Sequence, residues 1–72
     1  MNEYITPFAK QELKVIVDEL KEAGAELKFI TWGTGVDTVR LKRLRANHSC
    51  RFNNKEFSEI VKFYAGCHVN RK

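Results

Sequence analysis

Two histidines and two cysteines are the side chains of this 72-residue sequence with the most specific chemistry. His48 and Cys50 form one pair, and Cys67 and His68 form another, which is the ligand set of a tetrahedral zinc site. The spacing disfavours such a site, because adjacent side chains such as Cys67 and His68 rarely turn onto one ion. We expect no metal, no other cofactor and no disulfide, and we interpret these residues as half-buried thiols and surface histidines.

Patterns for catalysis are also missing from the sequence. The glycine-rich stretch Gly33-Thr34-Gly35 is shorter than a phosphate-binding P-loop and lacks its lysine. Neither of the two serines lies in a nucleophile elbow, and the acidic residues fall mainly on outer faces of expected helices. We therefore expect a protein that is not an enzyme and has no small-molecule substrate.

Positive charge is concentrated in the middle of the chain. Residues 28–55 hold seven lysines and arginines against Asp37 alone, whereas residues 1–27 hold three lysines against six acids. A concentrated basic segment favours a polyanionic partner, nucleic acid first, although a solvated basic face without a ligand has the same composition. The central segment is therefore the part of the chain most suited to such a partner.

Length and composition indicate one small domain that spans residues 1–72. A hydrophobic content of 43% is typical of a folded protein. No apolar run approaches the roughly 20 residues that span a bilayer, and the first residues lack the pattern of a signal peptide. We expect a soluble, cytoplasmic protein without a membrane partner.

The two ends of the sequence both predict helices. Thr6-Pro7 is typical of a helix start, and Gly24 of a helix end, so the first helix is expected at about 7–23. Asn53 or Asn54 is expected to cap a last helix, and Gly66 is expected to stop it. The apolar stripe of that helix consists of Phe57, Ile60, Val61 and Tyr64.

The segment between these helices fits either a β-hairpin or a pair of short helices. Strand alternation through Val39 and Leu41 fails once Arg43 and Leu44 are reached. The helical alternative accounts for more of the pattern, because Asp37 is a good N-cap and Gly35 supplies the permissive backbone of a tight bend. One helical face is then formed by Leu27, Ile30, Thr31 and Thr34, and the next by Leu41 and Leu44. We predict an all-α domain of four to five helices that contains a helix-turn-helix.

The spacing of the central residues is specific enough to compare with a known family. The pattern I-T-x-x-x-G-V-x-x-x-x-L-x-x-L is carried by Ile30, Thr31, Gly35, Val36, Leu41 and Leu44. The segment LKFITWGTGV resembles the helix-turn-helix of the phage Cro/repressor-like family, which reads like L-x-x-I-A-x-x-T-G-V-S. The leading helix and the helix after the recognition helix also occupy matching places, so the resemblance covers most of the chain. The chain departs from the family pattern at Thr31, which replaces alanine, and at Trp32 and Gly33 inside a helix.

The resemblance implies double-stranded DNA as the partner, with a recognition helix at about 37–46 in the major groove. It implies that the base-facing residues are Asp37, Thr38, Val39, Lys42 and Arg43. The candidates for phosphate contacts are Lys28, Thr34, Arg40, Arg45, Asn47 and Arg51. Arg43 has alternatives to base contact, because a phosphate contact or plain exposure suits an arginine equally well.

Three aromatic residues have two interpretations each. Trp32 either leans on a sugar-phosphate edge or covers the core beside the first helix, and we favour core. Phe63 lies off the apolar stripe of the last helix, with Phe52 just upstream. These two either fold back onto the core or contribute, together with the C-terminal tail, to a homodimer interface, and we favour the homodimer.

The resulting functional expectation is a sequence-specific DNA-binding regulator, such as a transcriptional repressor of phage, plasmid or bacterial origin. An excisionase-like architectural DNA-binding protein is one alternative. A protein-interaction module, such as a phage-encoded inhibitor of a host protein, is another, because fold does not determine function. The hairpin interpretation would instead give an α+β domain that binds RNA by its shape.

Overall fold

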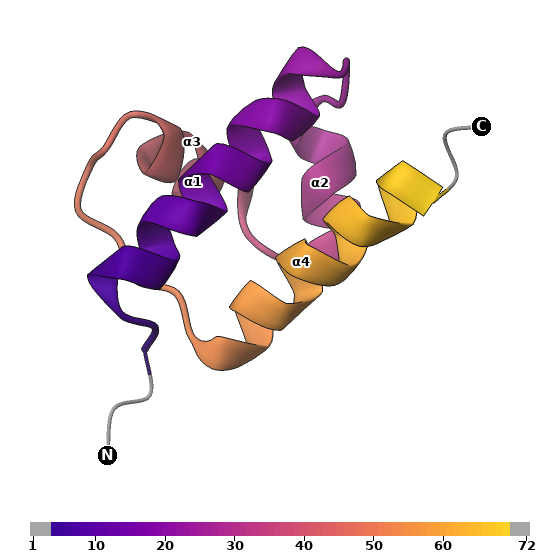
Figure 1. The fold of residues 1–72 in the computed structure, drawn as a ribbon. Helices are drawn as coiled ribbons and strands as arrows, with labels where there is room; N and C mark the ends of the chain where they lie inside the picture. The colour runs from indigo at the N-terminus through magenta and orange to yellow at the C-terminus, as the bar shows by residue number, and fades with distance from the viewer. Residues whose placement is uncertain (1–3, 70–72) are drawn as a thin grey trace.

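The computed structural model describes residues 4–69, and over that range the chain is all-α, as predicted. The elements are α1 (Pro7–Glu22), α2 (Leu27–Thr34), α3 (Thr38–Arg45) and α4 (Asn54–Val69) (Figure 1). Helix α4 packs against α1 and α2, and α3 packs against the same two helices. The hairpin interpretation is excluded, because Val39 and Leu41 both lie within α3.

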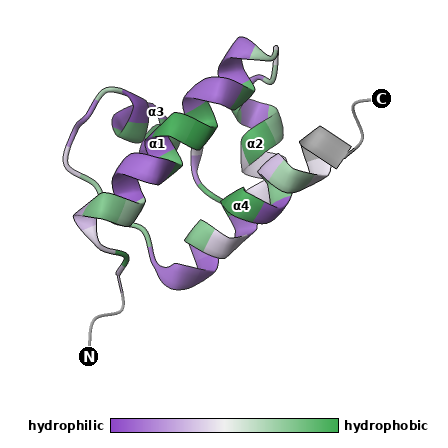
Figure 2. Ribbon diagram, viewed as in Figure 1, coloured by the Kyte–Doolittle hydropathy of each residue, from purple (hydrophilic) through white to green (hydrophobic). Residues whose placement is uncertain are grey.

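Helix α1 begins and ends where its residues predict. The Thr6 hydroxyl accepts a hydrogen bond of 3.1 Å from the Ala9 backbone N–H, and Pro7 follows where its missing N–H costs nothing. The helix ends at Glu22, and Gly24 then takes a φ of 102°, a conformation that glycine adopts without a steric penalty. Hydrophobic and hydrophilic turns alternate along α1 (Figure 2), as expected for a helix with one buried side.

Helices α2 and α3 are joined by the predicted bend at Gly35. Gly35 has a φ of 78°, and its N–H donates to the Thr31 carbonyl at 2.7 Å to close α2. The chain restarts at Asp37, whose carboxylate accepts from the Val39 N–H at 3.4 Å. Val36 lies between these two caps and is completely buried, so the bend is held by the core as well as by its backbone.

Helix α4 begins with a reciprocal cap and extends further than the sequence suggested. The Asn53 side chain accepts from the Glu56 N–H at 2.7 Å, and Glu56 accepts from the Asn53 N–H at 3.0 Å. The prediction that Gly66 ends the helix is wrong, because α4 continues to Val69. A glycine inside a helix costs about 1 kcal/mol, which the neighbouring turns of a long helix can offset.

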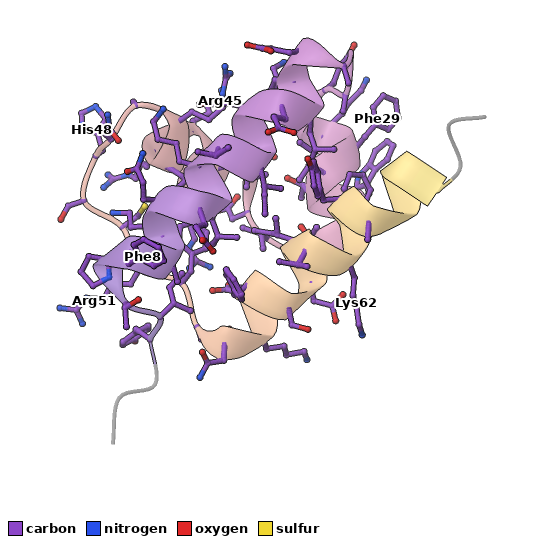
Figure 3. The ribbon with its side chains drawn as sticks, viewed as in Figure 1. Phe8, Phe29, Arg45, His48, Arg51 and Lys62 are labelled. Atoms are coloured by element: carbon purple, nitrogen blue, oxygen red, sulfur yellow. The ribbon has the colours of Figure 1, made fainter. Side chains whose placement is uncertain are left out.

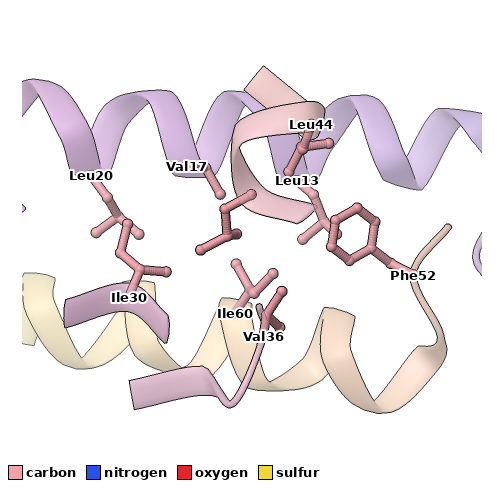
Figure 4. Close-up of a cluster of buried hydrophobic side chains, with 9 residues drawn as sticks. Leu13, Val17, Leu20, Ile30, Val36, Leu44, Phe52 and Ile60 are labelled. Carbon is pink, nitrogen blue, oxygen red and sulfur yellow. The ribbon is translucent and has the colours of Figure 1, made fainter. Parts of the chain in front are cut away.

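The core draws on all four helices and on the loop between α3 and α4 (Figure 4). Full burial stabilises each large apolar side chain by about 1.5–3 kcal/mol. The buried residues of the core are Leu13, Val17, Leu20, Ile30, Val36, Leu41, Leu44, Phe52 and Ile60. Phe52 is 1% exposed, so the expectation that this ring contributes to a dimer interface is wrong. Phe63 is half-buried against the cluster, and the C-terminal residues 70–72 expected to share the interface lie outside the described residues.

Gly33, which is unusual within a helix, has a tertiary explanation. A Cβ atom at this position would overlap with the ring of Phe63 on α4. The absence of a side chain therefore allows α2 and α4 to approach closely. The cost of glycine in the helix is offset by packing against the aromatic ring.

Candidate nucleic-acid interface on α3

The four basic residues of α3 divide into two pairs with different surroundings. Arg40 and Arg45 lie on the flanks of the helix and form ion pairs with acids of other helices. Lys42 and Arg43 are exposed, and among residues 4–69 neither forms an ion pair. Position on the helix therefore decides which cations stabilise the fold and which remain available to a partner.

Arg40 connects α3 to the start of α4. One of its guanidinium nitrogens lies 2.8 Å from a Glu56 carboxylate oxygen, and the group also donates to the second Glu56 oxygen and to the Arg51 carbonyl. The guanidinium carbon lies 4.6 Å from the centroid of the Phe52 ring. The hydrogen bond from Arg40 holds the pKa of the Glu56 carboxyl below its ordinary value. Arg40 is therefore occupied by the fold and not free to bind a phosphate.

Arg45 makes the corresponding connection to α1. Its Nε donates to an Asp18 carboxylate oxygen at 2.8 Å, and Lys14 donates to the other oxygen at 2.9 Å. The hydrogen bond from Arg45, followed by that from Lys14, lowers the pKa of the Asp18 carboxyl. Because Asp18 already neutralises part of its charge, Arg45 is a weaker phosphate candidate than the sequence suggested.

The outward face of α3 consists of Val39, Lys42 and Arg43. Val39 is 55% exposed, which leaves an aliphatic group on the surface one helical turn before the two cations. A nitrogen of Arg43 donates to the Ser49 carbonyl at 3.3 Å, a contact at the long end of the hydrogen-bond range that water or a ligand can replace. This face combines apolar and cationic groups on one exposed helix surface.

The remaining two residues of the expected base-facing set lie at the start of α3. Asp37 is exposed and caps the helix, so one of its oxygens is used locally. The hydroxyl of Thr38 lies 2.8 Å from that of Thr31 on α2, in a half-buried contact between the two helices. Thr38 therefore belongs mainly to the joint between α2 and α3.

Thr34 lies where it cannot meet a phosphate. Thr34 is 8% exposed, its hydroxyl donates to the Ile30 carbonyl at 2.7 Å, and the same oxygen accepts from the Val36 N–H at 3.2 Å. The expectation of a phosphate contact is therefore wrong. This threonine instead satisfies the backbone at the bend.

The other phosphate candidates are exposed. Lys28 lies in the first turn of α2, 3.7 Å from Glu26, and Asn47 takes a φ of 63° in the turn after α3. Arg51 lies over the Tyr4 ring at 5.3 Å. Figure 3 shows Arg45, His48 and Arg51 on the side of the molecule formed by α3 and the following loop. The loop after α3 therefore carries two further exposed side chains, His48, whose backbone N–H donates to the Arg43 carbonyl at 2.9 Å, and Arg51.

Two acids that determine which cations are available were not identified from the sequence. Both Asp18 and Glu56 were covered only by the general expectation that the acidic residues fall mainly on outer helix faces. The Asn53-x-x-Glu56 spacing is typical of a capping box, which was a usable signal for the local contact of Glu56. No sequence signal joins Glu56 to Arg40 or Asp18 to Arg45, because both contacts require the tertiary fold.

Trp32 does not cover the core, contrary to expectation. It is 72% exposed on α2, where its ring meets that of Phe29 edge-on at a centroid distance of 5.5 Å. The side of α2 that faces the core is already filled by Ile30 and Thr34. The tryptophan is thus placed on the surface by helical spacing.

Only the first of the two histidine and cysteine pairs falls among the described side chains. His48 is exposed and Cys50 is half-buried, whereas the side chains of Cys67 and His68 lie outside the described residues. Within the described side chains, no group of three or more potential metal ligands is found. No helix within residues 4–69 has the length and apolar character needed to cross a bilayer.

Comparison with known proteins found no relative of this chain. No protein-family model, curated protein or solved structure matches it. A functional assignment for this chain therefore depends on its own residues and their arrangement.

Proposed function

We propose that the protein is a sequence-specific DNA-binding regulator that inserts α3 into the major groove of a duplex. The observation that carries this proposal is the division of cations on α3, where Lys42 and Arg43 are exposed without an acidic partner among residues 4–69. The resemblance of residues 30–44 to the helix-turn-helix of Cro/repressor-like proteins supports the same function, because those proteins read DNA with the second of two such helices.

The outward face of α3 has the chemistry that base recognition requires. The major groove admits one α-helix, where arginine or lysine can pair with guanine O6 and N7 and an aliphatic side chain can contact a thymine methyl. Lys42 and Arg43 would supply the first kind of contact, and Val39 the second. Each well-formed bidentate contact would discriminate between bases by about 1–3 kcal/mol.

Phosphate binding would come from an exposed cation of the loop that follows α3. Arg51 is exposed in this loop, and the phosphate backbone supplies most of the affinity of small DNA readers. Arg40 and Arg45 would act indirectly, by holding α3 against α4 and α1. The affinity should therefore fall steeply as salt concentration rises, because bound cations release counterions from DNA.

Fluorescence anisotropy with labelled duplexes tests the proposal. A preferred duplex is first selected from a random pool, and binding is then measured on that duplex and on a random one over a range of salt concentrations. Arg43→Ala should reduce binding to the preferred duplex more than to the random one, whereas Arg51→Ala should weaken both alike. Lys62→Ala is the matched control, because Lys62 is an exposed lysine on α4 (Figure 3).

Two results would contradict the proposal. One is binding that is absent or independent of salt for the wild-type chain. The other is an Arg43→Ala variant that binds both duplexes like the Lys62→Ala variant. If binding is salt-dependent but no duplex is preferred, an excisionase-like architectural role replaces sequence-specific regulation.

A protein-interaction module is the second candidate function. The exposed rings of Phe29 and Trp32 favour it, because large aromatic side chains on a surface are typical of protein contacts. This candidate predicts that the Lys42 and Arg43 variants leave the protein's binding to its partner unchanged.

A further inference from the structure

Phe29 and Trp32 form an exposed aromatic pair on α2. They are 46% and 72% exposed, and their rings meet edge-on at 5.5 Å. The two residues are three positions apart, so they share one side of the helix. Neither belongs to the cluster of buried residues, so the fold of residues 4–69 leaves most of the tryptophan surface in contact with water.

The charges beside the aromatic pair are balanced. Lys28 lies 3.7 Å from Glu26, and its ammonium group lies 5.6 Å from the centroid of the Phe29 ring. Both charged side chains are about 60% exposed, at 60% for Lys28 and 63% for Glu26. The outward face of α3 differs, because its exposed side chains Lys42 and Arg43 are cationic. In Figure 3, Phe29 lies far across the molecule from His48 and Arg51, which belong to the loop after α3.

We propose that the aromatic pair is the centre of a homodimer interface, in which a second copy of this chain docks α2 against α2 about a two-fold axis. In such an interface the same surface meets itself, so each rim charge must find its opposite on the other copy. Glu26 of one copy would face Lys28 of the other, twice. A chain with a net charge of +4 repels its own copies through its basic faces, which leaves a charge-balanced face as the favourable one.

The size of the aromatic pair determines how strong a dimer we expect. Tryptophan and phenylalanine are large contacts of about 150–250 Å² each, and tryptophan is enriched among interface hot spots. Four such rings supply a compact centre but less than the roughly 1,200–2,000 Å² of a standard stable interface. We therefore expect a weak dimer, with a dissociation constant roughly in the micromolar range.

The chain contains a single tryptophan, so Trp32 reports directly on its own surface. Sedimentation equilibrium of the full chain over a concentration series measures the dimer. Tryptophan emission and acrylamide quenching measured on the same samples show whether Trp32 becomes buried. We expect the emission to shift to the blue and quenching to decrease along the same concentration curve that describes the dimer.

Substitutions then locate the interface. Trp32→Ala and Phe29→Ala should each raise the dissociation constant at least about tenfold, as expected of hot-spot residues. Phe8→Ala is the matched control, because Phe8 is an aromatic residue of α1 that is 75% exposed and lies across the molecule from Phe29 (Figure 3). That variant should dimerise like the wild type.

A charge exchange tests the two-fold arrangement. Glu26→Lys and Lys28→Glu should each weaken self-association, because like charges then face each other twice. A mixture of the two variants should recover a heterodimer, because each contact again joins opposite charges. This recovery would not occur if the substitutions acted only by disturbing α2.

Three outcomes would overturn the inference. They are a monomer at every concentration, a dimer whose dissociation constant responds equally to Phe8→Ala and Trp32→Ala, and a mixture of charge variants that stays monomeric. A blue shift that appears only when duplex DNA is added to the monomer would also overturn it, by assigning the pair to nucleic acid. The inference does not depend on the proposed function, because every arm except the DNA addition is measured without a duplex.

Discussion

Helices α2 and α3 have the same length of eight residues, lie next to each other and meet through Thr31 and Thr38, yet they are held in different ways. Helix α2 is held by close apolar packing, because Gly33 lets the ring of Phe63 approach the backbone of α2. Helix α3 is held on both flanks by charge, through Arg40 to Glu56 and Arg45 to Asp18.

Helices this short are unstable alone in water, so the manner of anchoring determines what each can tolerate. An apolar contact responds to changes in volume, whereas an ion pair responds to pH and salt. The exposed faces differ too, since α2 presents an aromatic pair and α3 presents cations. The structure thus separates an exposed aromatic face from an exposed cationic face.

The largest effect on stability is expected from Arg40→Met. The change leaves the Glu56 carboxylate without its cation and removes the bonds to the Arg51 carbonyl and the contact with the Phe52 ring. We expect the free energy of unfolding to fall by about 2 kcal/mol, a value reduced from that of a fully buried pair because both groups remain partly exposed. Urea denaturation followed by far-ultraviolet circular dichroism measures it. Arg43→Met is the control, and equal losses for the two variants would remove the distinction between anchoring and available cations.

Gly33→Ala should destabilise by a net amount of about 1 kcal/mol. Alanine improves helix propensity by about 1 kcal/mol, but displacing the Phe63 ring costs about 1–3 kcal/mol. The same urea titration checks it, together with a double-mutant cycle that includes Phe63→Leu. In the Phe63→Leu background the alanine should be neutral or stabilising. A stabilising Gly33→Ala in the wild-type background would show that close packing does not hold α2.

Lowering the pH should weaken the ion pairs that hold α3 against α4 and α1. The pKa values of Glu56 and Asp18 are lowered in the folded chain by Arg40 and Arg45, from ordinary values of 4.5 and 3.8. Their stabilisation is therefore present above those ordinary values and is lost as pH falls through the lower folded values. We expect a loss of less than about 1 kcal/mol for each exposed pair, measured by denaturation at a series of pH values. Arg40→Met should reduce this pH dependence, and an unchanged profile would contradict the ion-pair account.

The smallest effects are expected on the two exposed faces. Lys42→Ala and Trp32→Ala should each change the free energy of unfolding by less than about 0.5 kcal/mol, because neither side chain lies in the core. For Trp32, the lost contact with Phe29 is offset by the better helix propensity of alanine. Thermal and urea unfolding check both. A large loss from either variant would mean that its face stabilises the fold, which would remove the reason to assign it to a partner.

Local physical chemistry was enough to predict the helices and their boundaries. The Thr6 and Asp37 caps, the bend at Gly35 and the spacing of Ile30, Leu41 and Leu44 each depend on a few neighbouring residues. Such preferences act over one or two turns, so they can be recognised without knowledge of the fold. Gly66 is the exception, because a glycine permits a helix to end without requiring it.

The candidate site was predictable only in part. The outward positions of Val39, Lys42 and Arg43 follow from helical periodicity once α3 is recognised. Helical periodicity does not show which acids of other helices lie next to α3. The ion pairs of Arg40 and Arg45 therefore could not be predicted, and these two residues could not be distinguished from Lys42 and Arg43.

What the sequence by itself determined is the set of elements: where each helix starts, where the chain bends, and that its positive charge is concentrated in the middle. Only the tertiary structure decided that Phe52 is core, that Trp32 is surface and that Gly33 makes room for a ring. The reason is the range of the interactions. Caps and turns form between near neighbours, whereas burial and ion pairing depend on which distant segments the packed core brings together.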